Sequence, residues 1–419
     1  MLANYLKIAW KVLQRQKFYT FISLFGISLT LLILLVATAM FDSIYGPQPP
    51  EVHSDRTLHL ETLAMRGPKD VIFPGGPGYL FLDHFIRPMA AMPEVEGVAV
   101  IGGQETAASY AGGQKALSTL RRTDGELWRI LEFDFLEGRP FTVEEDRQGR
   151  FVAVINEATR QRVFGRGPAV GRTFEIGGQT FRVVGVVRNV SSLRETSFAD
   201  VWVPISTIKS DVYKRELVGG FQALLLARSR SDFPAIRAEL DRRLRQAKSH
   251  LPSYFDRLEG GADTLFESTS RYLPPGGDPY ERSRPGLLRA ALFLSMLLFM
   301  LLPAINLVNI NLSRILERSS EIGVRKAFGA SSRALVGQFV VENLMLTLVG
   351  GAIGLALAAA VLHGLNASGL ISYSQLSVNV RVFVYGLGIA VLFGLLSGVY
   401  PAWKMSRLHP AEALRGRSR

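Results

Sequence analysis

Four long stretches without a charged residue dominate the hydropathy pattern of this chain. They are Phe18–Phe41, Ala290–Ser313, Asn343–Val380 and Val382–Trp403. A helix of about 20 apolar residues crosses a bilayer core about 30 Å thick, and only helices and closed barrels satisfy their backbone polar groups inside lipid. The pattern therefore predicts an α-helical membrane protein with four transmembrane helices, at residues 18–41, 290–313, 339–363 and 382–403. The third stretch also includes a short polar turn.

Residues 42–285, between the first and second predicted spans, mix polar and apolar positions. This segment is long enough to form its own hydrophobic core. Runs of β-type and helix-type periodicity predict a first β-α-β unit over residues 52–102, with strands at Thr57–Leu63 and Val95–Ile101 and a helix at Leu82–Met92. A similar unit is expected over 219–270, with a strand at Phe221–Ala227, a helix at Phe233–Lys248 and a closing strand at Thr264–Ser268. We therefore expect an α+β domain made of two β-α-β halves.

The two halves are separated by a β-rich insertion, residues 103–218. Predicted strands are Phe151–Ile155, Thr173–Ile176, Thr180–Val187 and Asp200–Ile205, and Asn156–Phe164 is a predicted short helix. Gly177-Gly178 between two of these strands is typical of a β-hairpin turn.

The net charge of +12 first suggests a nucleic-acid partner, but its distribution argues against one. Residues 1–17 carry +4, residues 314–333 carry +3 and residues 404–419 carry +4, whereas residues 42–285 hold 32 bases and 32 acids. Lys and Arg beside spans mark the cytoplasmic side and contact anionic lipid. We therefore expect both termini and the 314–333 loop in the cytoplasm, residues 42–285 outside, a short outer loop at 364–381 and no nucleic acid. Residues 1–17 are expected to form an amphipathic helix at the inner lipid surface, or simply to flank the first span.

Catalytic and metal-binding patterns are absent from the sequence. The six histidines lack metal-ligand spacing, there is no cysteine, and no phosphate-binding loop or nucleophile elbow occurs. The acidic trio Glu144-Glu145-Asp146 is expected to be a solvated loop. We therefore expect no enzyme active site, no metal and no cofactor in this chain.

Polar and small residues in the second and third spans predict helix contacts. Asparagine is costly in hydrocarbon, so Asn306 and Asn309 need partners within the protein, or else have a part in substrate passage. Gly350, Gly354 and Ala358 recur every four residues, a pattern that lets helices approach closely within the chain or across a dimer. Glu342, near the inner end of the third span, is expected to snorkel or to pair with a nearby base.

The cytoplasmic loop, residues 314–333, contains the most specific motif. As a helix it places Glu317 and Glu321 one turn apart and Glu321 four residues before Arg325. Ile322 and Phe328 stay exposed, and Gly329 can end the helix. Such a face is commonly only solvated, yet a short mixed-charge helix with apolar residues also suits docking onto a soluble partner.

The sequence 317–331, ERSSEIGVRKAFGAS, resembles the cytoplasmic-loop signature of the MacB/FtsX-like (type VII) ABC transporter permeases. The tail Gly398–Lys404 and Leu408–Arg415 is similar to the same family. Phe135–Phe141, Phe151–Gly165, Val170–Arg172 and Phe181–Val187 look like the MacB periplasmic core. The resemblance covers nearly the whole chain.

The resemblance implies a permease that dimerises, with an identical or homologous second permease, and works with two ATPase subunits. The β-α-β halves would be porter-like and the insertion sabre-like, and the 314–333 loop would seat on the ATPase. Residues implied in coupling are Glu317, Arg318, Glu321, Ile322, Gly323, Arg325, Lys326, Phe328 and Gly329. Because only 17 residues precede the first span, we expect ATP to be bound by a separate subunit and not by this chain.

These expectations place the chain in the cell inner membrane, with its large domain in the periplasm. The resemblance implies a permease that transmits ATPase-driven motion to the periplasmic domain, most simply for efflux of a hydrophobic or peptidic compound, with a periplasmic adaptor as a further partner. Two alternatives stay open: a mechanical regulator of a cell-wall hydrolase, and a lipoprotein-extraction permease.

Overall fold

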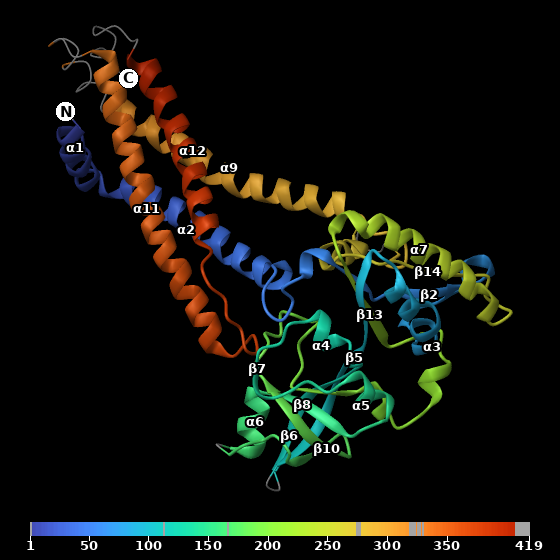
Figure 1. Ribbon diagram of the computed structural model, residues 1–419. Coiled ribbons are helices and arrows are strands. Elements are labelled where there is room, and N and C mark those ends of the chain that lie inside the picture. Colours follow the sequence, from blue (N-terminus) through green and yellow to red (C-terminus); the bar gives the residue numbers. More distant parts are fainter. Residues whose placement is uncertain are drawn as a thin grey trace. The chain divides into compact units, whose positions relative to one another are not determined.

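The fold is described from a computed structural model of the chain (Figure 1). It describes residues 2–111, 114–165, 167–273, 278–317 and 331–406, and the single positions Val324 and Phe328. The chain divides into two compact units. The helical unit comprises residues 1–41, 290–370 and 375–419, and the outer unit comprises residues 42–289 and 371–374.

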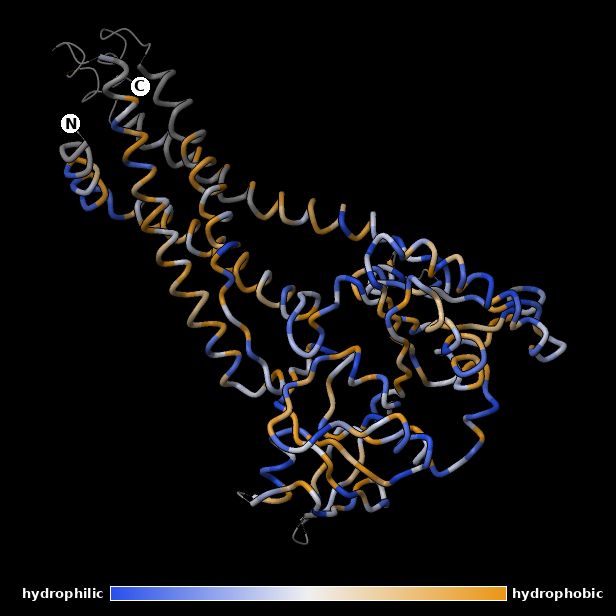
Figure 2. The backbone as a smooth tube through the Cα atoms, in the orientation of Figure 1, coloured by the Kyte–Doolittle hydropathy of each residue, from blue (hydrophilic) through white to orange (hydrophobic). Residues whose placement is uncertain are grey.

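The helical unit contains a short amphipathic helix, α1 (Leu2–Arg15), and long apolar helices: α2 (Lys17–Tyr45), α9 (Pro285–Glu317), α11 (Ser332–Ser368) and α12 (Val380–Ser406). Within the described residues, α2 and residues 336–368 of α11 are long and apolar enough to cross a membrane. The apolar parts described in α9 and α12, Pro285–Phe299 and Val380–Leu392, are shorter. Figure 2 shows α2 and the coloured parts of α9, α11 and α12 as predominantly hydrophobic, in contrast to the mixed outer unit.

One face of α2 is buried and the other is exposed. Ile27, Leu31 and Leu35, spaced every four residues, are buried, while Phe21 and Phe25 are exposed. Large apolar side chains on an outer helix face are what a lipid environment covers. The exposed phenylalanines therefore agree with a membrane-facing helix.

The outer unit is organised around a nine-stranded mixed sheet with the order β1-β13-β5-β6-β11-β8-β10-β7, in which β9 pairs with β10 and β5. The strands are β1 (Thr57–Leu60), β5 (Val95–Ala111), β6 (Gln114–Thr123), β7 (Phe135–Gly138), β8 (Val152–Asn156), β9 (Thr173–Ile176), β10 (Gln179–Val187), β11 (Val201–Pro204) and β13 (Phe221–Ala227). Strand β13 lies between β1 and β5 and is antiparallel to both. The near-continuous apolar runs in β8 and β13 follow from burial on both faces.

Two small sheets complete the β-structure. One pairs β14 (Arg257–Gly260) with β2 (Leu63–Arg66) and β3 (Ile72–Phe73), and the other pairs β12 (Val218–Gly219) with β4 (Gly76–Pro77). The shorter helices are α3 (Tyr79–Phe81), α4 (Leu127–Ile130), α5 (Val143–Arg147), α6 (Glu157–Phe164), α7 (Phe233–Gln246) and α8 (Leu265–Thr269). A π turn, Leu82–Ile86, and a 3-10 turn, Arg87–Ala91, continue α3 where a single helix was predicted.

The hydrophobic core of the outer unit has three clusters. One packs α7, through Ile236 and Leu240, against strands β1 and β13. A second surrounds Trp202 with Trp128 and other aromatic rings, and a third surrounds Phe181. The first cluster comes mainly from the residues predicted as β-α-β halves, with Ile205, Tyr213, Leu217 and Val218 added from the predicted insertion. The third cluster lies within the predicted insertion.

Other sequence expectations are also wrong. The expected strand Thr57–Leu63 ends at Leu60, and Leu63 begins β2 in a separate sheet. The expected strand at Thr264–Ser268 is the start of α8, because Thr264 and Glu267 form a capping box that favours a helix; pairing there is the single bridge between His59 and Asp263. The acidic trio 144–146 is not a solvated loop but the body of α5. Thr142 and Glu145 cap this helix, and Asp146 is buried, accepting a bond from the backbone N of Ser206 at 3.2 Å.

Two pairs of glycines lie where the main sheet crosses the predicted boundary of the insertion. They are Gly102-Gly103 in β5 and Gly219-Gly220, directly before β13. Strand β5 has a register shift between Ile101 and Gln104, which places Gly102 and Gly103 at an irregularity. Gly102 is opposite Phe221, and the N–H of Gly103 donates to the carbonyl of Gly220 at 2.9 Å. Strand β5 is thus continuous from the first half into the insertion.

Candidate functional site

The small residues of α11 lie against α2 in the helical unit. A Cβ atom on Gly350 would come within 2.9 Å of Ile27, and one on Gly354 within 2.9 Å of the Ser28 carbonyl. The Ser28 hydroxyl donates to the Gly350 carbonyl at 3.0 Å, and Ala358 is fully buried. The stripe therefore brings two backbones of the same chain into close contact.

Glu342 lies on the same helix and is buried. The Gln338 amide donates to its carboxylate at 2.8 Å. Asn306 and Asn309 lie on α9, where the backbone is helical, and their side chains are outside the described part of the structure.

The predicted coupling loop runs between the end of α9, at Glu317, and the start of α11, at Ser332. Of the residues implied in coupling, Arg318, Glu321, Ile322, Gly323, Arg325, Lys326 and Gly329 are outside the described residues. Phe328 is described, and its backbone N–H donates to the Val324 carbonyl at 3.1 Å. The Phe328 side chain is 88% exposed and that of Val324 47%. An exposed apolar pair in a loop is a surface that a partner can cover.

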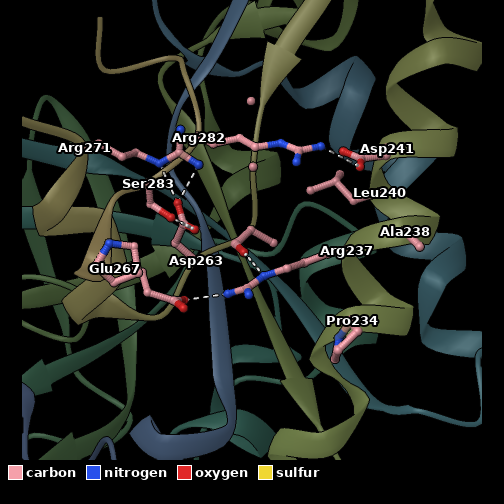
Figure 3. A pocket seen from close by; sticks show the side chains of 14 residues that line it. Pro234, Arg237, Ala238, Leu240, Asp241, Asp263, Glu267, Arg271, Arg282 and Ser283 are labelled. Carbon is pink, nitrogen blue, oxygen red and sulfur yellow. Dashed lines mark hydrogen bonds and ion pairs between the residues drawn. The ribbon is translucent and has the colours of Figure 1, made fainter. Parts of the chain in front are cut away.

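Sequence reasoning missed a cluster of charged groups at the point where the outer unit leads into α9. The cluster lines a cavity of about 440 Å³ beside α7 and α8, shown in Figure 3. Arg271 is buried and donates to Asp263 at 2.5 Å, and the Ser283 hydroxyl donates to the same carboxylate at 2.7 Å. Arg271 also donates to the carbonyls of Pro279 and Glu281. These bonds fix the segment that precedes α9.

Two further pairs complete the wall of this cavity. Arg237 of α7 donates to Glu267 at 2.5 Å, and Arg282 lies 3.9 Å from Asp241. Figure 3 shows Arg271 and Ser283 pointing toward Asp263, and Arg237 reaching Glu267. Each arginine is matched by a carboxylate, so the cavity has no excess charge and its bonds indicate a structural role.

A comparable buried cluster holds the segment that follows α2. The guanidinium of Arg194 contacts Glu51 at 3.1 Å and the Gly46 carbonyl at 3.0 Å, and the Ser197 hydroxyl donates to Glu51 at 2.6 Å. Arg194 and Glu51 are both buried. A buried pair with every oxygen bonded costs much if one partner is lost, because the remaining charge is uncompensated.

Comparison with known proteins identifies the family. Residues 20–243 match the MacB-like periplasmic core domain, and residues 293–410 match the FtsX-like permease C-terminal family. The chain belongs to the MacB/FtsX-like permeases. These are the type VII permeases of ABC transporters, so the resemblance inferred from the loop and tail motifs is confirmed.

The relatives of this MacB/FtsX-like chain include named exporters. It is 29% identical over 279 residues to the "Macrolide export ATP-binding/permease protein MacB" of Bdellovibrio bacteriovorus, covering 66% of this chain and 41% of the relative. It is 28% identical over 415 residues to the "Pyoverdine export ATP-binding/permease protein PvdT" of Pseudomonas entomophila, covering 98% of this chain and 59% of the relative. The chain thus spans less than two thirds of the length of either.

Among solved structures, the chain is similar to the periplasmic region of MacB from Actinobacillus actinomycetemcomitans. The identity is 15% and the TM-score 0.35, covering 49% of this chain and 89% of that structure.

Proposed function

We propose that this chain is the permease subunit of an ABC exporter, and that it transmits ATP-driven motion through its spanning helices to a periplasmic domain. The supporting observation is the succession, on one chain, of a MacB-like periplasmic core and an FtsX-like permease region. In this proposal α2, α9, α11 and α12 are the four spans, both termini are cytoplasmic, and the outer unit is periplasmic.

The proposed ATPase contact is the 314–333 loop. The exposure of Val324 and Phe328 supports a docking role, because aromatic and other apolar side chains are enriched in the core of protein interfaces. ATP would be bound by a dimer of separate ATPase subunits, and a second, identical or homologous permease would complete the complex. The names of the relatives, which concern macrolide and pyoverdine export, support efflux of a hydrophobic or peptidic compound, with a periplasmic adaptor as partner.

The decisive experiment is co-purification with a candidate ATPase, followed by ATPase assays of Glu321→Lys. Reversing the charge of Glu321 replaces its predicted i,i+4 attraction to Arg325 by repulsion and places a cation at the proposed interface. We expect weaker assembly and at least a tenfold loss of coupled ATP hydrolysis, an energy of about 1.4 kcal/mol.

Asp211→Lys, the same charge change on an exposed acid of the outer unit, is the matched control and should leave assembly intact. Unchanged assembly and hydrolysis in Glu321→Lys would refute the loop assignment. Co-purification of a cell-wall hydrolase or a lipoprotein, with no transported compound, would replace the exporter by one of the two alternatives.

A further inference from the structure

The segment between β10 and β11, residues 188–200, is held firmly although it has no regular secondary structure. Gln104 of β5 donates to the Glu195 carbonyl at 3.0 Å. Arg121 of β6, which is buried, donates to the carbonyls of Glu195, at 2.8 Å, and of Thr196. Burial lowers the pKa of Arg121 to about 10, so the guanidinium still carries its charge at neutral pH. The segment is therefore attached to the main sheet through its backbone.

Asp200, at the end of this segment, is a buried carboxylate that collects bonds from several elements. One oxygen accepts from the backbone N of Thr119 in β6 at 2.8 Å. The other accepts from the Asn156 amide at 3.0 Å, and Asn156 also caps α6. Both of these donors are uncharged groups.

The third donor to Asp200 comes from a distant part of the sequence. Tyr373, in the connection between α11 and α12, donates its hydroxyl to Asp200 at 3.1 Å. The neighbouring Ser372 carbonyl accepts from the backbone N of Ser192 at 2.9 Å, and the rings of Tyr373 and Phe198 are 6.4 Å apart.

Residues 371–374 group with the outer unit although the residues on both sides of them, Leu370 and Gln375, group with the helices. Tyr373 has a backbone φ of +55°, which a bulky residue adopts only when its surroundings hold it there. Burial, together with the nearby charge of Asp200, raises the pKa of Tyr373, so its hydroxyl remains a donor at neutral pH.

We propose that Ser372 and Tyr373 form a clasp, in which the connection between α11 and α12 grips the 188–200 segment and so links the third and fourth predicted spans to the outer sheet. The same segment is bound through Arg194 and Ser197 to Glu51, just after α2. Motion of the spanning helices would then reach the outer sheet at one segment from two separate parts of the chain. This mechanical consequence rests on the proposed function, whereas the contact itself does not.

The absence of native cysteine from the sequence allows a direct test of the contact. Ser192 and Ser372 share a backbone hydrogen bond, which brings their Cα atoms into the range that a disulfide spans. In the full chain in membranes, the double variant Ser192→Cys/Ser372→Cys should form an intramolecular disulfide under mild oxidation, read as protection from a maleimide-polymer mass tag.

The matched controls are the single variants Ser192→Cys and Ser372→Cys, which have no second thiol in the chain and should stay reduced and tagged. Full tagging of the double variant would overturn the clasp. This measurement needs no ATPase, so it succeeds or fails independently of the proposed function.

A second measurement tests the role of the hydroxyl. Tyr373→Phe keeps the ring beside Phe198 but cannot donate to Asp200, and loss of a bond to a charged group should increase local opening by roughly tenfold. We expect faster hydrogen exchange at residues 191–200 of the full chain, and reduced coupled hydrolysis in the complex with its ATPase. Tyr272→Phe, at an exposed position of the outer unit, is the control.

Unchanged exchange in Tyr373→Phe would refute the bond. Faster exchange with unchanged coupled hydrolysis would refute the transmitting role of the clasp. If Glu321→Lys lost coupled hydrolysis while Tyr373→Phe changed neither hydrogen exchange nor coupled hydrolysis, the proposed function would be supported and the clasp refuted.

Discussion

Glu145 is the acidic side chain that helps to fix residues 143–147 as helix α5. It accepts two bonds from Arg139, both at 2.8 Å, and one from the backbone N of Thr142 at 2.9 Å. The Arg139 hydrogen bond, acting against partial burial, lowers the pKa of Glu145 to about 2. The charged form is therefore the one that the folded chain prefers.

The pH dependence of stability follows from this shift. Because the folded pKa is depressed from 4.5, the contribution of Glu145 is complete above about pH 4.5 and is lost as the pH falls toward 2. Glu145→Gln should lower the free energy of unfolding by about 1 kcal/mol at pH 7, the usual value of a helix cap, and by less at pH 3. Urea unfolding of the full chain, followed by tryptophan fluorescence, measures both. Glu144→Gln, on the exposed neighbour, should show no such pH-dependent difference; an equal loss at both pH values in Glu145→Gln would contradict the assignment.

At the scale of elements, the contact between α2 and α11 depends on the absence of side chains. The backbone of α11 approaches Ser28 and Leu31 so closely at Gly354 that a methyl group would meet atoms at 2.9 and 3.0 Å. Gly364, on the same helix, has nothing within 4 Å of the corresponding position. The two glycines therefore differ in packing while sharing the same helical backbone.

Alanine substitution separates these two situations. Gly354→Ala should lower the melting temperature in detergent, since overpacking costs about 1–3 kcal/mol. Gly364→Ala should be neutral or stabilising by up to about 1 kcal/mol, because alanine is the better helix former. A thermal unfolding series on the two variants decides the matter, and a stability gain in both would show that the stripe is not tightly packed.

Elements with strong local patterns could be predicted from the sequence. Strand β13 at Phe221–Ala227 and strand β9 at Thr173–Ile176 have the predicted bounds, because a buried apolar run and a strict alternation each carry their own signal. Strand β6 was missed, since its polar sequence becomes a strand only by pairing with β5 and β11. Residues 264–268 do not form the expected strand, because the pattern Thr-x-x-Glu, Thr264 to Glu267, caps a helix there.

The candidate sites also differ in how far the sequence predicts them. The glycine stripe is visible in the sequence because its period is local, but the identity of its partner, α2, depends on a contact between residues about 320 positions apart. The carboxylate of Asp200 gave no signal, since its donors Thr119, Asn156 and Tyr373 come from three separate regions. Long-range polar networks of this kind leave no periodicity in the chain.

At the scale of the whole molecule, the charge distribution leads to a topology that can be tested without any partner. The cysteine-free sequence allows single thiols to be placed at exposed sites on opposite sides of the predicted bilayer. Phe328→Cys lies in the proposed cytoplasmic loop and Leu370→Cys follows α11 on the proposed outer side, and both native side chains are exposed.

In intact cells, a membrane-impermeant maleimide should label Leu370→Cys and leave Phe328→Cys unlabelled until the membrane is opened. The physical reason is the positive charge beside the loop, which retains it in the cytoplasm. Labelling of Phe328→Cys from outside would invert the topology and remove the ATPase interface proposed for it. Val212→Cys, at an exposed position of the outer unit, reports whether the reagent reaches the periplasm.

The glycine crossing in the main sheet has a mechanical consequence. Gly103 of β5 and Gly220, directly before β13, are joined by a backbone hydrogen bond. Neither residue has a side chain that could interlock with a neighbour. Interlocked side chains resist shear in a close-packed interior, because any displacement must open voids or create clashes. We therefore expect the sheet to deform most easily at these glycines when a torsional load is applied at one of its edges.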